Sequence, residues 1–433
     1  MYDQIAMPKT SRWTPIVLLL LASVALFIRT AGLQATGVGG NDTILYYSLA
    51  EQWLEGNPVY RIANSAEVFR PVLLAYNALS LKLLGHSDYA IKLANAVVDS
   101  LNVLLVAFVA WLLSRGLLVC LASALAYTLL PLAIWAARQE LPHTLSTFFV
   151  LLALVSTLMA AGGGYRQWWL GGLGGFFLGF AVLTHEELVF IAAPVAIVLL
   201  LSPRLMGEID TIRAACWRLG PFLFGPAAAA LLILWHESAA LRVLSEPAAL
   251  TVGQRFYPEV LGRFFWNGLS GAGSLVFLAL IGVGFAVFIW QSLPPYREGG
   301  RRYRLAYLFC MGTFIVFLAL YALFFDTLFV RGLLPMIPLQ LIAIVYSLAI
   351  AFEPLGRVPS AAMVLVLALG LGISNIGAYS AFKVGNRDYS DHWDIPEWPD
   401  RESWEKGYRG FRYDALYDPS YYTHWANVHA ALA

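Results

Sequence analysis

A series of apolar runs of roughly helix-spanning length constrains this chain more than any other feature. About eleven such runs occur in the 433 residues, near 14–32, 90–113, 116–136, 142–161, 168–184, 188–202, 219–236, 269–291, 305–325, 332–351 and 360–381. A helix of about 20 apolar residues crosses the ~30 Å hydrocarbon core of a bilayer. The sequence therefore predicts an all-α polytopic membrane protein with about eleven transmembrane helices.

The composition supports this class of protein. Hydrophobic residues make up 59% of the chain and charged residues only 13%, whereas soluble domains carry about 25% charged residues. A soluble chain of this length would need a charged surface that this sequence cannot supply. The net charge of +1 gives no electrostatic reason to expect nucleic-acid binding.

The basic residues of the short loops gather on one predicted side of the membrane. These residues are Lys9, Arg12, Arg115, Arg166, Arg204, Arg213, Arg218, Arg297, Arg301, Arg302, Arg304 and Arg357. Cytoplasmic loops carry an excess of Lys and Arg, so we expect a multi-pass protein of the plasma (inner) membrane with a cytoplasmic N-terminus. No cleavage-site pattern follows the first run, which we interpret as a retained signal anchor.

The predicted topology divides the chain into two regions. Residues 1–382 form the transmembrane domain, and residues 33–89 form its first exterior loop, with amphipathic helices. Residues 383–433 form a periplasmic or exterior tail that is rich in Trp, Tyr, Asp and Pro. About fifty residues are few for an independent core. We expect the tail to pack on the exterior face or at the lipid interface, or to dock protein partners.

Another stretch, Gly162–Gly175, is rich in glycine and reads GGGYRQWWLGGLGG. It lacks the Lys-Ser/Thr that follows a phosphate-binding loop. Small residues in membrane helices let two backbones approach closely. The stretch therefore predicts close helix packing.

Within the first exterior loop, Asp42 is the leading candidate for chemistry. It follows the turn Gly39-Gly40-Asn41 and precedes ILYYSLAEQWLEG, which predicts an amphipathic helix carrying Tyr46. A carboxylate here can cap the helix by accepting backbone N–H bonds. It can also act as a general base toward an attacking hydroxyl, or as a ligand of a divalent metal ion. Capping and catalysis are compatible roles.

Other polar residues gather on the same predicted side. They are Arg61, Arg70, Arg138, Glu140, His143, His185, Glu186, Glu187 and Arg331. Any one of them can reach water from the end of a span, and arginine also binds phosphate oxygens in a bidentate way. Several clusters on one side indicate a shared polar cavity. The HEE sequence is not a zincin motif, because Val189 stands four residues after His185 where a second His is required.

The order of these pieces resembles the GT-C superfamily of membrane glycosyltransferases. The resemblance is to the branch similar to glycosyltransferase family 39, with the protein mannosyltransferases and the lipid A aminoarabinose transferase. It covers roughly residues 10–350 and rests on the acidic first loop, on RPVLLAYNALSLKLLGHSDYAIKLANAVVDSL, and on RGLLPMIPLQLIA at Arg331–Ala343. It implies a GT-C fold and a transferase whose donor is a sugar linked to polyprenyl phosphate, bound among membrane lipids.

The resemblance also implies roles for individual residues. Asp42 matches the catalytic acid of the first loop, and Arg331 matches the arginine of a span-opening "RYLLP" element, so Arg331 is expected at the donor phosphate with Arg61 or Arg70. The expected lining of the acceptor side is Tyr46, Arg138, Glu140, His143, His185, Glu186 and Glu187. The chain departs from the family pattern at Thr43, His143 and His185.

These observations lead to one expected function and two alternatives. We expect transfer of a sugar from the lipid-linked donor to a lipid, glycan or protein acceptor on the exterior face. The departures from the family pattern keep open a non-catalytic GT-C-like subunit of a larger membrane complex. A transporter or lipid flippase is disfavoured, because the ionisable residues are expected at span ends and coupling ions usually bind at mid-span.

Overall fold

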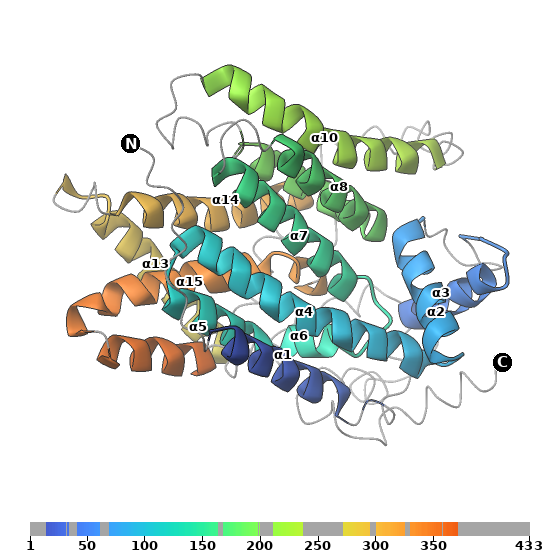
Figure 1. Cartoon of the computed structure of the whole chain (residues 1–433), viewed down its shortest axis with the longest axis horizontal. Helices are drawn as coiled ribbons and strands as arrows, with labels where there is room; N and C mark the ends of the chain where they lie inside the picture. Colours follow the sequence, from blue (N-terminus) through green and yellow to red (C-terminus); the bar gives the residue numbers. More distant parts are fainter. Residues whose placement is uncertain are drawn as a thin grey trace.

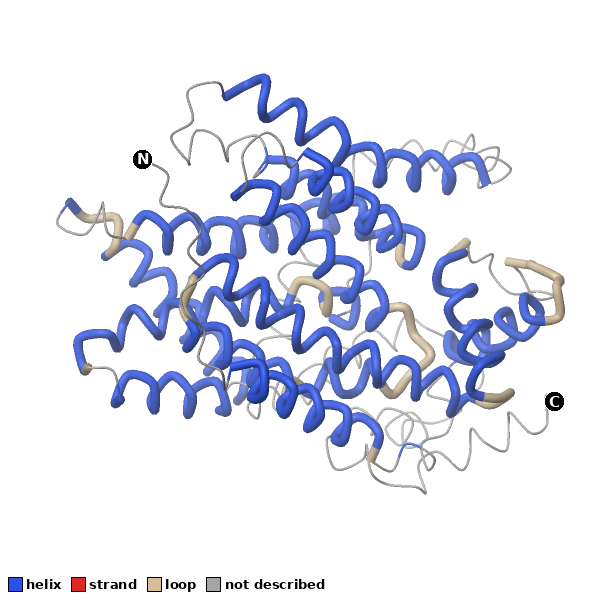
Figure 2. Tube along the Cα trace, viewed as in Figure 1, coloured by secondary structure: helices blue, strands red, loops and turns tan. Residues whose placement is uncertain are grey.

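The structure, a computed structural model, describes residues 14–31, 33, 41–60, 69–162, 168–197, 199, 211–236, 272–294, 300–324, 330–356 and 358–370. All regular elements in these residues are helical, and no strand occurs among them (Figure 2). Arg61 and the expected exterior tail, residues 383–433, lie outside the described residues.

The helices form a bundle with a small helical cap at one end. In chain order they are α1 Thr14–Thr30, α2 Asn41–Leu54, α3 Pro71–Leu84, α4 Asp88–Ser114, α5 Leu117–Thr128, α6 Pro131–Ala137, α7 His143–Gly162, α8 Trp168–Thr184, the 3₁₀-helix η3 Glu186–Ile191, α10 Thr211–His236, α13 Ala272–Trp290, α14 Arg301–Phe324, η7 Val330–Leu333, α15 Ile337–Phe352 and η8 Glu353–Leu355. A further helix spans Val358–Gly370. Figure 1 shows α2 and α3 together at one end of the bundle and α10 along an edge beside α8.

Five described helices are long and apolar enough to cross a membrane. These are Tyr89–Ser114, His143–Ala161, Leu219–His236, Arg301–Leu320 and Ile337–Leu355. Shorter apolar helices lie at Thr14–Thr30, Pro71–Leu84, Leu117–Thr128, Trp169–Thr184, Ala279–Trp290 and Val358–Gly370. The described part of the chain is all-α, and the chain is a multi-pass membrane protein. The count of about eleven spans stays a prediction.

One expected span, 116–136, is divided in the structure. Helix α5 ends at Thr128 and the short helix α6 begins at Pro131. A proline has no backbone N–H to donate, and it disfavours helical geometry in the residue before it. After the break, α6 runs to Ala137, and the polar segment 138–142 then connects it to α7.

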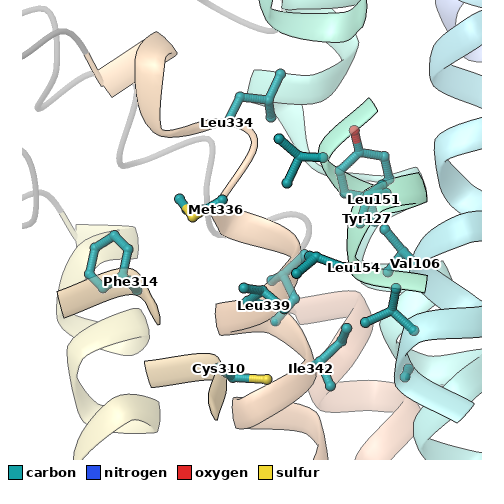
Figure 3. Packing of buried hydrophobic residues seen from close by; sticks show 14 of the residues in the cluster. Val106, Tyr127, Leu151, Leu154, Cys310, Phe314, Leu334, Met336, Leu339 and Ile342 are labelled. Carbon is teal, nitrogen blue, oxygen red and sulfur yellow. The ribbon is translucent and has the colours of Figure 1, made fainter. Parts of the chain in front are cut away.

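The apolar core lies between helices α4 and α7 on one side and helices α14 and α15 on the other. Figure 3 shows Val106 of α4 and Leu154 of α7 across from Leu339 and Ile342 of α15, with Phe314 of α14 beyond them. Each of these five side chains is buried. The helices also carry apolar side chains on the faces that point away from the bundle. Large examples are Phe27, Phe224 and Trp235, which are exposed.

Helices α8 and α10 approach each other at glycine residues. A Cβ atom on Gly175 would overlap the carbonyl oxygen of Phe222, and one on Gly225 would overlap the carbonyl oxygen of Gly175. Backbone contact of this kind requires residues without a side chain. The expectation of close helix packing is therefore confirmed for the described part of the glycine-rich stretch.

A buried ion pair joins the first helix to the bundle. Nε of Arg29 lies 2.5 Å from Oδ2 of Asp99, and both side chains are fully buried. Tyr127 donates its hydroxyl hydrogen to Oδ1 of Asp99 at 2.7 Å, and Nη1 of Arg29 donates to the carbonyl of Thr128 at 3.1 Å. These contacts tie α1 to α4 and α5. Asp99 lies inside the span Tyr89–Ser114, so the expectation that ionisable residues occur only at span ends is wrong at this position.

Removing the charge of Asp99 should strongly destabilise the protein. Asp99→Asn leaves the buried guanidinium of Arg29 without its counter-charge, and breaking a buried pair in this way costs about 3–5 kcal/mol. Val97→Ala on the same helix removes a 44% exposed side chain and should cost less than about 1 kcal/mol. Thermal unfolding in detergent measures both changes. Equal unfolding temperatures for the two variants would contradict the assigned role of the pair.

The glycine contact gives a second prediction. Gly225→Ala should force α8 and α10 apart and lower the unfolding temperature, because the new methyl group overlaps the backbone of α8. Gly220→Ala is the matched control on the same helix, since a Cβ there meets nothing within 4 Å. We expect the control to be neutral or slightly stabilising, as alanine favours helix over glycine by about 1 kcal/mol. A neutral Gly225→Ala would show that the two helices pack less closely.

Candidate functional site

The candidate site begins with Arg70, the residue just before α3. Pro71 starts that helix, which suits a first helical position whose N–H has no intrahelical partner. Nε and Nη2 of Arg70 donate to the two carboxylate oxygens of Glu186, at 3.0 and 2.7 Å, and Nη1 donates to the hydroxyl of Tyr46. One arginine thus joins α2, α3 and η3, three elements that are far apart in the sequence.

The electrostatics of this pair follow from its surroundings. Burial alone would raise the pKa of Glu186, but the charge and hydrogen bonds of Arg70, with a contribution from His185, outweigh burial and lower that pKa to about 2. Burial acts against the charged form of Arg70 as well, yet Tyr46 and Glu186 raise the pKa of its guanidinium above the usual value. Both side chains are therefore ionised at neutral pH.

A second group of polar side chains lies beside this pair. Nδ1 of His185 is 3.4 Å from Oε2 of Glu187, and the ring centroid of His143, at the start of α7, is 5.3 Å from that of His185. A Cβ atom on Gly332 of η7 would lie 3.4 Å from the same Oε2 of Glu187. The structure therefore brings η3, α7 and η7 together at the end of the bundle that also carries Arg70.

Among the predicted site residues, the structure describes only the backbone of Asp42 and Arg331, and it does not describe Arg61. Helix α2 begins at Asn41, so Asp42 lies in the first turn and not at the predicted cap position. A carboxylate there is still favoured by the helix dipole. Tyr46 follows Asp42 by four residues, which puts both on one face of α2. Arg331 lies in η7 next to Gly332, and Arg61 is outside the described residues.

The structure places two other predicted residues against the first helix and α4. Arg138 is fully buried, and its Nη1 donates to the carbonyls of Arg29 at 3.2 Å and Ala31 at 2.6 Å. These carbonyls belong to the end of α1, where a cation complements the helix dipole. Glu140 lies 3.5 Å from Nζ of Lys92, with both side chains fully buried. The described contacts of Arg138 thus hold the end of α1, where the first loop starts, and Glu140 contacts the first turns of α4.

A polar stripe on α4 was missed in the sequence. Lys92, Asn95, Asp99 and Asn102 are all fully buried, and their spacing puts them on one helix face. Nδ2 of Asn95 donates to the carbonyl of Gln139 at 2.6 Å. The sequence shows this stripe as polar residues spaced three and four apart within an apolar run. Such spacing predicts a polar helix face that packs against neighbouring helices.

A metal ion finds no ready donor set in the described residues. No group of three or more His, Cys, Asp and Glu side chains there is arranged to hold one. The His185–Glu187 contact supplies two such side chains, and the ring of His143 packs beside that of His185. A divalent ion at Asp42 therefore stays a prediction.

The Arg70–Glu186 pair should contribute to stability in a defined pH range. A carboxyl whose pKa is lowered on folding stabilises the protein above its unfolded value near 4.5 and loses this contribution as pH falls toward 2. The side chain of Glu186 is 40% exposed, so solvent screening limits the coupling to about 1 kcal/mol. A double-mutant cycle of Arg70→Gln and Glu186→Gln by thermal unfolding should show constant coupling from pH 5 to 8 and weaker coupling toward pH 3. A coupling that grows on acidification would contradict the assignment.

Comparison with known proteins gives a clear result only at the level of structure. No family model and no curated protein matches the sequence. ArnT from Cupriavidus metallidurans, solved bound to undecaprenyl phosphate, matches with a TM-score of 0.54 and 16% identity over 87% of this chain and 77% of its own. The archaeal oligosaccharyltransferase AglB from Archaeoglobus fulgidus, in complex with an inhibitory peptide and a dolichol-phosphate, matches with a TM-score of 0.53 and 15% identity.

The two neighbours differ from this chain in length. The match covers 86% of this chain but 56% of the AglB chain, so this chain spans just over half of that enzyme. A structure of the Archaeoglobus fulgidus enzyme in complex with Zn and sulfate matches with a TM-score of 0.50 and 15% identity, over 86% of this chain and 52% of that one. AglB and ArnT are both members of the GT-C superfamily. The resemblance seen in the sequence is therefore confirmed for the fold: this chain has the fold of the GT-C superfamily.

Proposed function

We propose that this chain is a membrane glycosyltransferase. It moves a sugar from a polyprenyl-phosphate donor to a lipid, glycan or protein acceptor on the exterior face of the inner membrane. The observation that carries the proposal is Arg70, which Glu186 and Tyr46 hold at the end of the bundle where the first loop meets η3. A fixed, ionised guanidinium at a membrane boundary is suited to bind a lipid-linked phosphate.

The geometry leaves Arg70 able to bind a further anion. A guanidinium carries five N–H donors, and its described contacts use one on Nε, one on Nη1 and one on Nη2. Two N–H groups therefore remain for phosphate oxygens. We assign Arg331 of η7, with Arg61 of the first loop, to the same phosphate.

The proposed chemistry is attack of an acceptor hydroxyl on the anomeric carbon of the donor sugar. The new bond forms to the acceptor oxygen, the bond from the anomeric carbon to the phosphate oxygen breaks, and Asp42 takes the hydroxyl proton. Arg70 and Arg331 stabilise the charge that develops on the leaving phosphate. His143, His185, Glu186 and Glu187 line the acceptor side, while Arg138 and Glu140 position the first loop through their contacts with α1 and α4.

An apolar groove offers a binding site for the isoprenoid chain of the donor. It has a volume of about 230 Å³ and runs between α8 and α10, and its lining ends at Leu183, next to the HEE segment. Isoprenoid chains are apolar, so such a groove can hold one while its phosphate reaches the polar end of the bundle. The ArnT structure was solved with undecaprenyl phosphate bound, and the AglB structure with a dolichol-phosphate.

The alternative is a non-catalytic GT-C-like subunit that binds partners through residues 383–433. Two observations favour it: Thr43, His143 and His185 depart from the family pattern, and Glu186 already balances the charge of Arg70. Gentle-detergent purification followed by mass spectrometry separates the two proposals. A bound polyprenyl phosphate without stable partners supports the transferase, and a stoichiometric set of partners without such a lipid supports the subunit.

Two substitutions test the transferase. Asp42→Asn should lower the rate of sugar transfer from a polyprenyl-phosphate sugar by about 10²-fold or more, the usual contribution of a general base. Arg70→Gln should raise KM and also lower kcat, because Arg70 is assigned both to hold the donor phosphate and to stabilise the charge that develops on it. Glu55→Gln, an exposed position in the same loop, is the control and should leave both constants unchanged. Full activity of Asp42→Asn would remove the role assigned to that carboxylate.

A further inference from the structure

We infer that Glu186 is a specificity-determining residue that favours the singly charged phosphodiester of the donor over the more highly charged phosphate monoester that remains after transfer. This inference rests on the proposed function. It assigns to Glu186 a task beyond lining the acceptor side, namely keeping the spent lipid carrier from occupying the phosphate position.

The charge of the lipid changes during the proposed reaction. In the donor, the phosphate links the lipid to the sugar and carries one negative charge. When the acceptor oxygen replaces the phosphate oxygen at the anomeric carbon, the leaving group keeps the bonding electron pair and becomes a phosphate monoester. The acceptor proton passes to the base and then to water. A phosphate monoester carries about −1.5 to −2 charges at pH 7, so product and donor differ by nearly one unit of charge.

The contacts of Glu186 hold a negative charge close to the proposed position of the phosphate, where it would repel the doubly charged product more than the singly charged donor. Its two carboxylate oxygens accept from Nε and Nη2 of Arg70. Its side chain is 40% exposed, whereas that of Arg70 is 16% exposed, so the carboxylate is the more exposed partner of the pair. A phosphate that binds the remaining N–H groups of Arg70 therefore lies within a few ångströms of Glu186.

Nearby groups keep the local charge from becoming strongly positive. Glu187 follows in the chain, and its Oε2 lies beside Gly332 of η7, next to the position of Arg331. The guanidinium of Arg70 thus has two carboxylates near it, those of Glu186 and Glu187. Two cations without carboxylates would bind a dianion more tightly than a monoanion and would retain the product. With the carboxylates in place, the extra charge of the product meets repulsion close to the guanidinium.

A purely structural salt bridge would give a different result on substitution. Loss of an anchoring contact displaces the guanidinium, which weakens the binding of anionic ligands at Arg70, and most of all the binding of the most highly charged one. Loss of a charge changes binding in proportion to ligand charge, since Coulomb energy scales with the product of the charges. The ratio of affinities for two ligands of equal shape and different charge therefore separates the two roles.

The experiment uses the full-length protein in detergent and three short-chain isoprenoid ligands. These are the phosphate monoester, its isosteric sulfate with a single charge, and its methyl phosphodiester with a single charge. We expect the wild-type protein to bind the sulfate and the diester at least as tightly as the monoester at pH 7.5. Glu186→Gln should tighten binding of the monoester by about tenfold and of the two monoanions by about threefold. Glu55→Gln is the matched control and should change neither value.

The outcomes separate this inference from the proposed function. Equal changes for phosphate and sulfate in Glu186→Gln would overturn the inference while leaving phosphate binding at the site intact. A wild-type protein that already binds the monoester tenfold more tightly than the sulfate would also overturn it, and this result needs no variant. If none of the ligands binds the wild-type protein, or if Arg70→Gln leaves their binding unchanged, the proposed function itself fails.

Discussion

The buried pair of Arg29 and Asp99 is the interaction on which the arrangement at the site depends. A charge in the interior of a membrane protein is tolerated only when a counter-charge and hydrogen bonds compensate it. Asp99 meets both needs through Arg29 and Tyr127. The pair therefore determines how α1 is rotated and how deep it sits against α4 and α5. The end of α1 then sets where the first loop starts.

Arg138 extends the same constraint to the entry of that loop. Its guanidinium binds two carbonyls at the end of α1, and the segment that carries it lies against the polar stripe of α4 through Asn95 and Lys92. Buried hydrogen bonds of this kind are directional, unlike apolar contacts. They keep α1, α4 and the start of α7 in one register, and α7 begins with His143, beside His185.

The partly exposed pair of Arg70 and Glu186 has a different character. Exposed ion pairs add little to stability, so the value of this pair lies in its geometry. It joins α3 to η3 across 116 residues of sequence and holds an ionised guanidinium at the end of the bundle. The fold shared with ArnT and AglB supplies the frame, whereas the functional properties proposed above depend on these particular side chains.

Much of the fold could be predicted from the sequence, because hydrophobicity is a local property. The length of each apolar run, the polar first loop with Asp42 and the close packing of Gly175 need only nearby residues to be recognised. The grouping of His143, His185 and Glu187 followed from their common position at span ends. The break before Pro131 was readable as well, but it was overlooked inside a longer apolar run.

The tertiary structure alone decided which charged residues meet. Arg70 could have paired with any carboxylate near a span end, and Asp99 could have faced any neighbouring helix. These choices depend on the rotation of each helix about its axis and on which helices become neighbours. Both are set by contacts between residues that are distant in sequence, such as Arg29 and Asp99, which are 70 positions apart. The sequence by itself thus determined the membrane class and the side on which polar residues gather, and packing decided how they are paired.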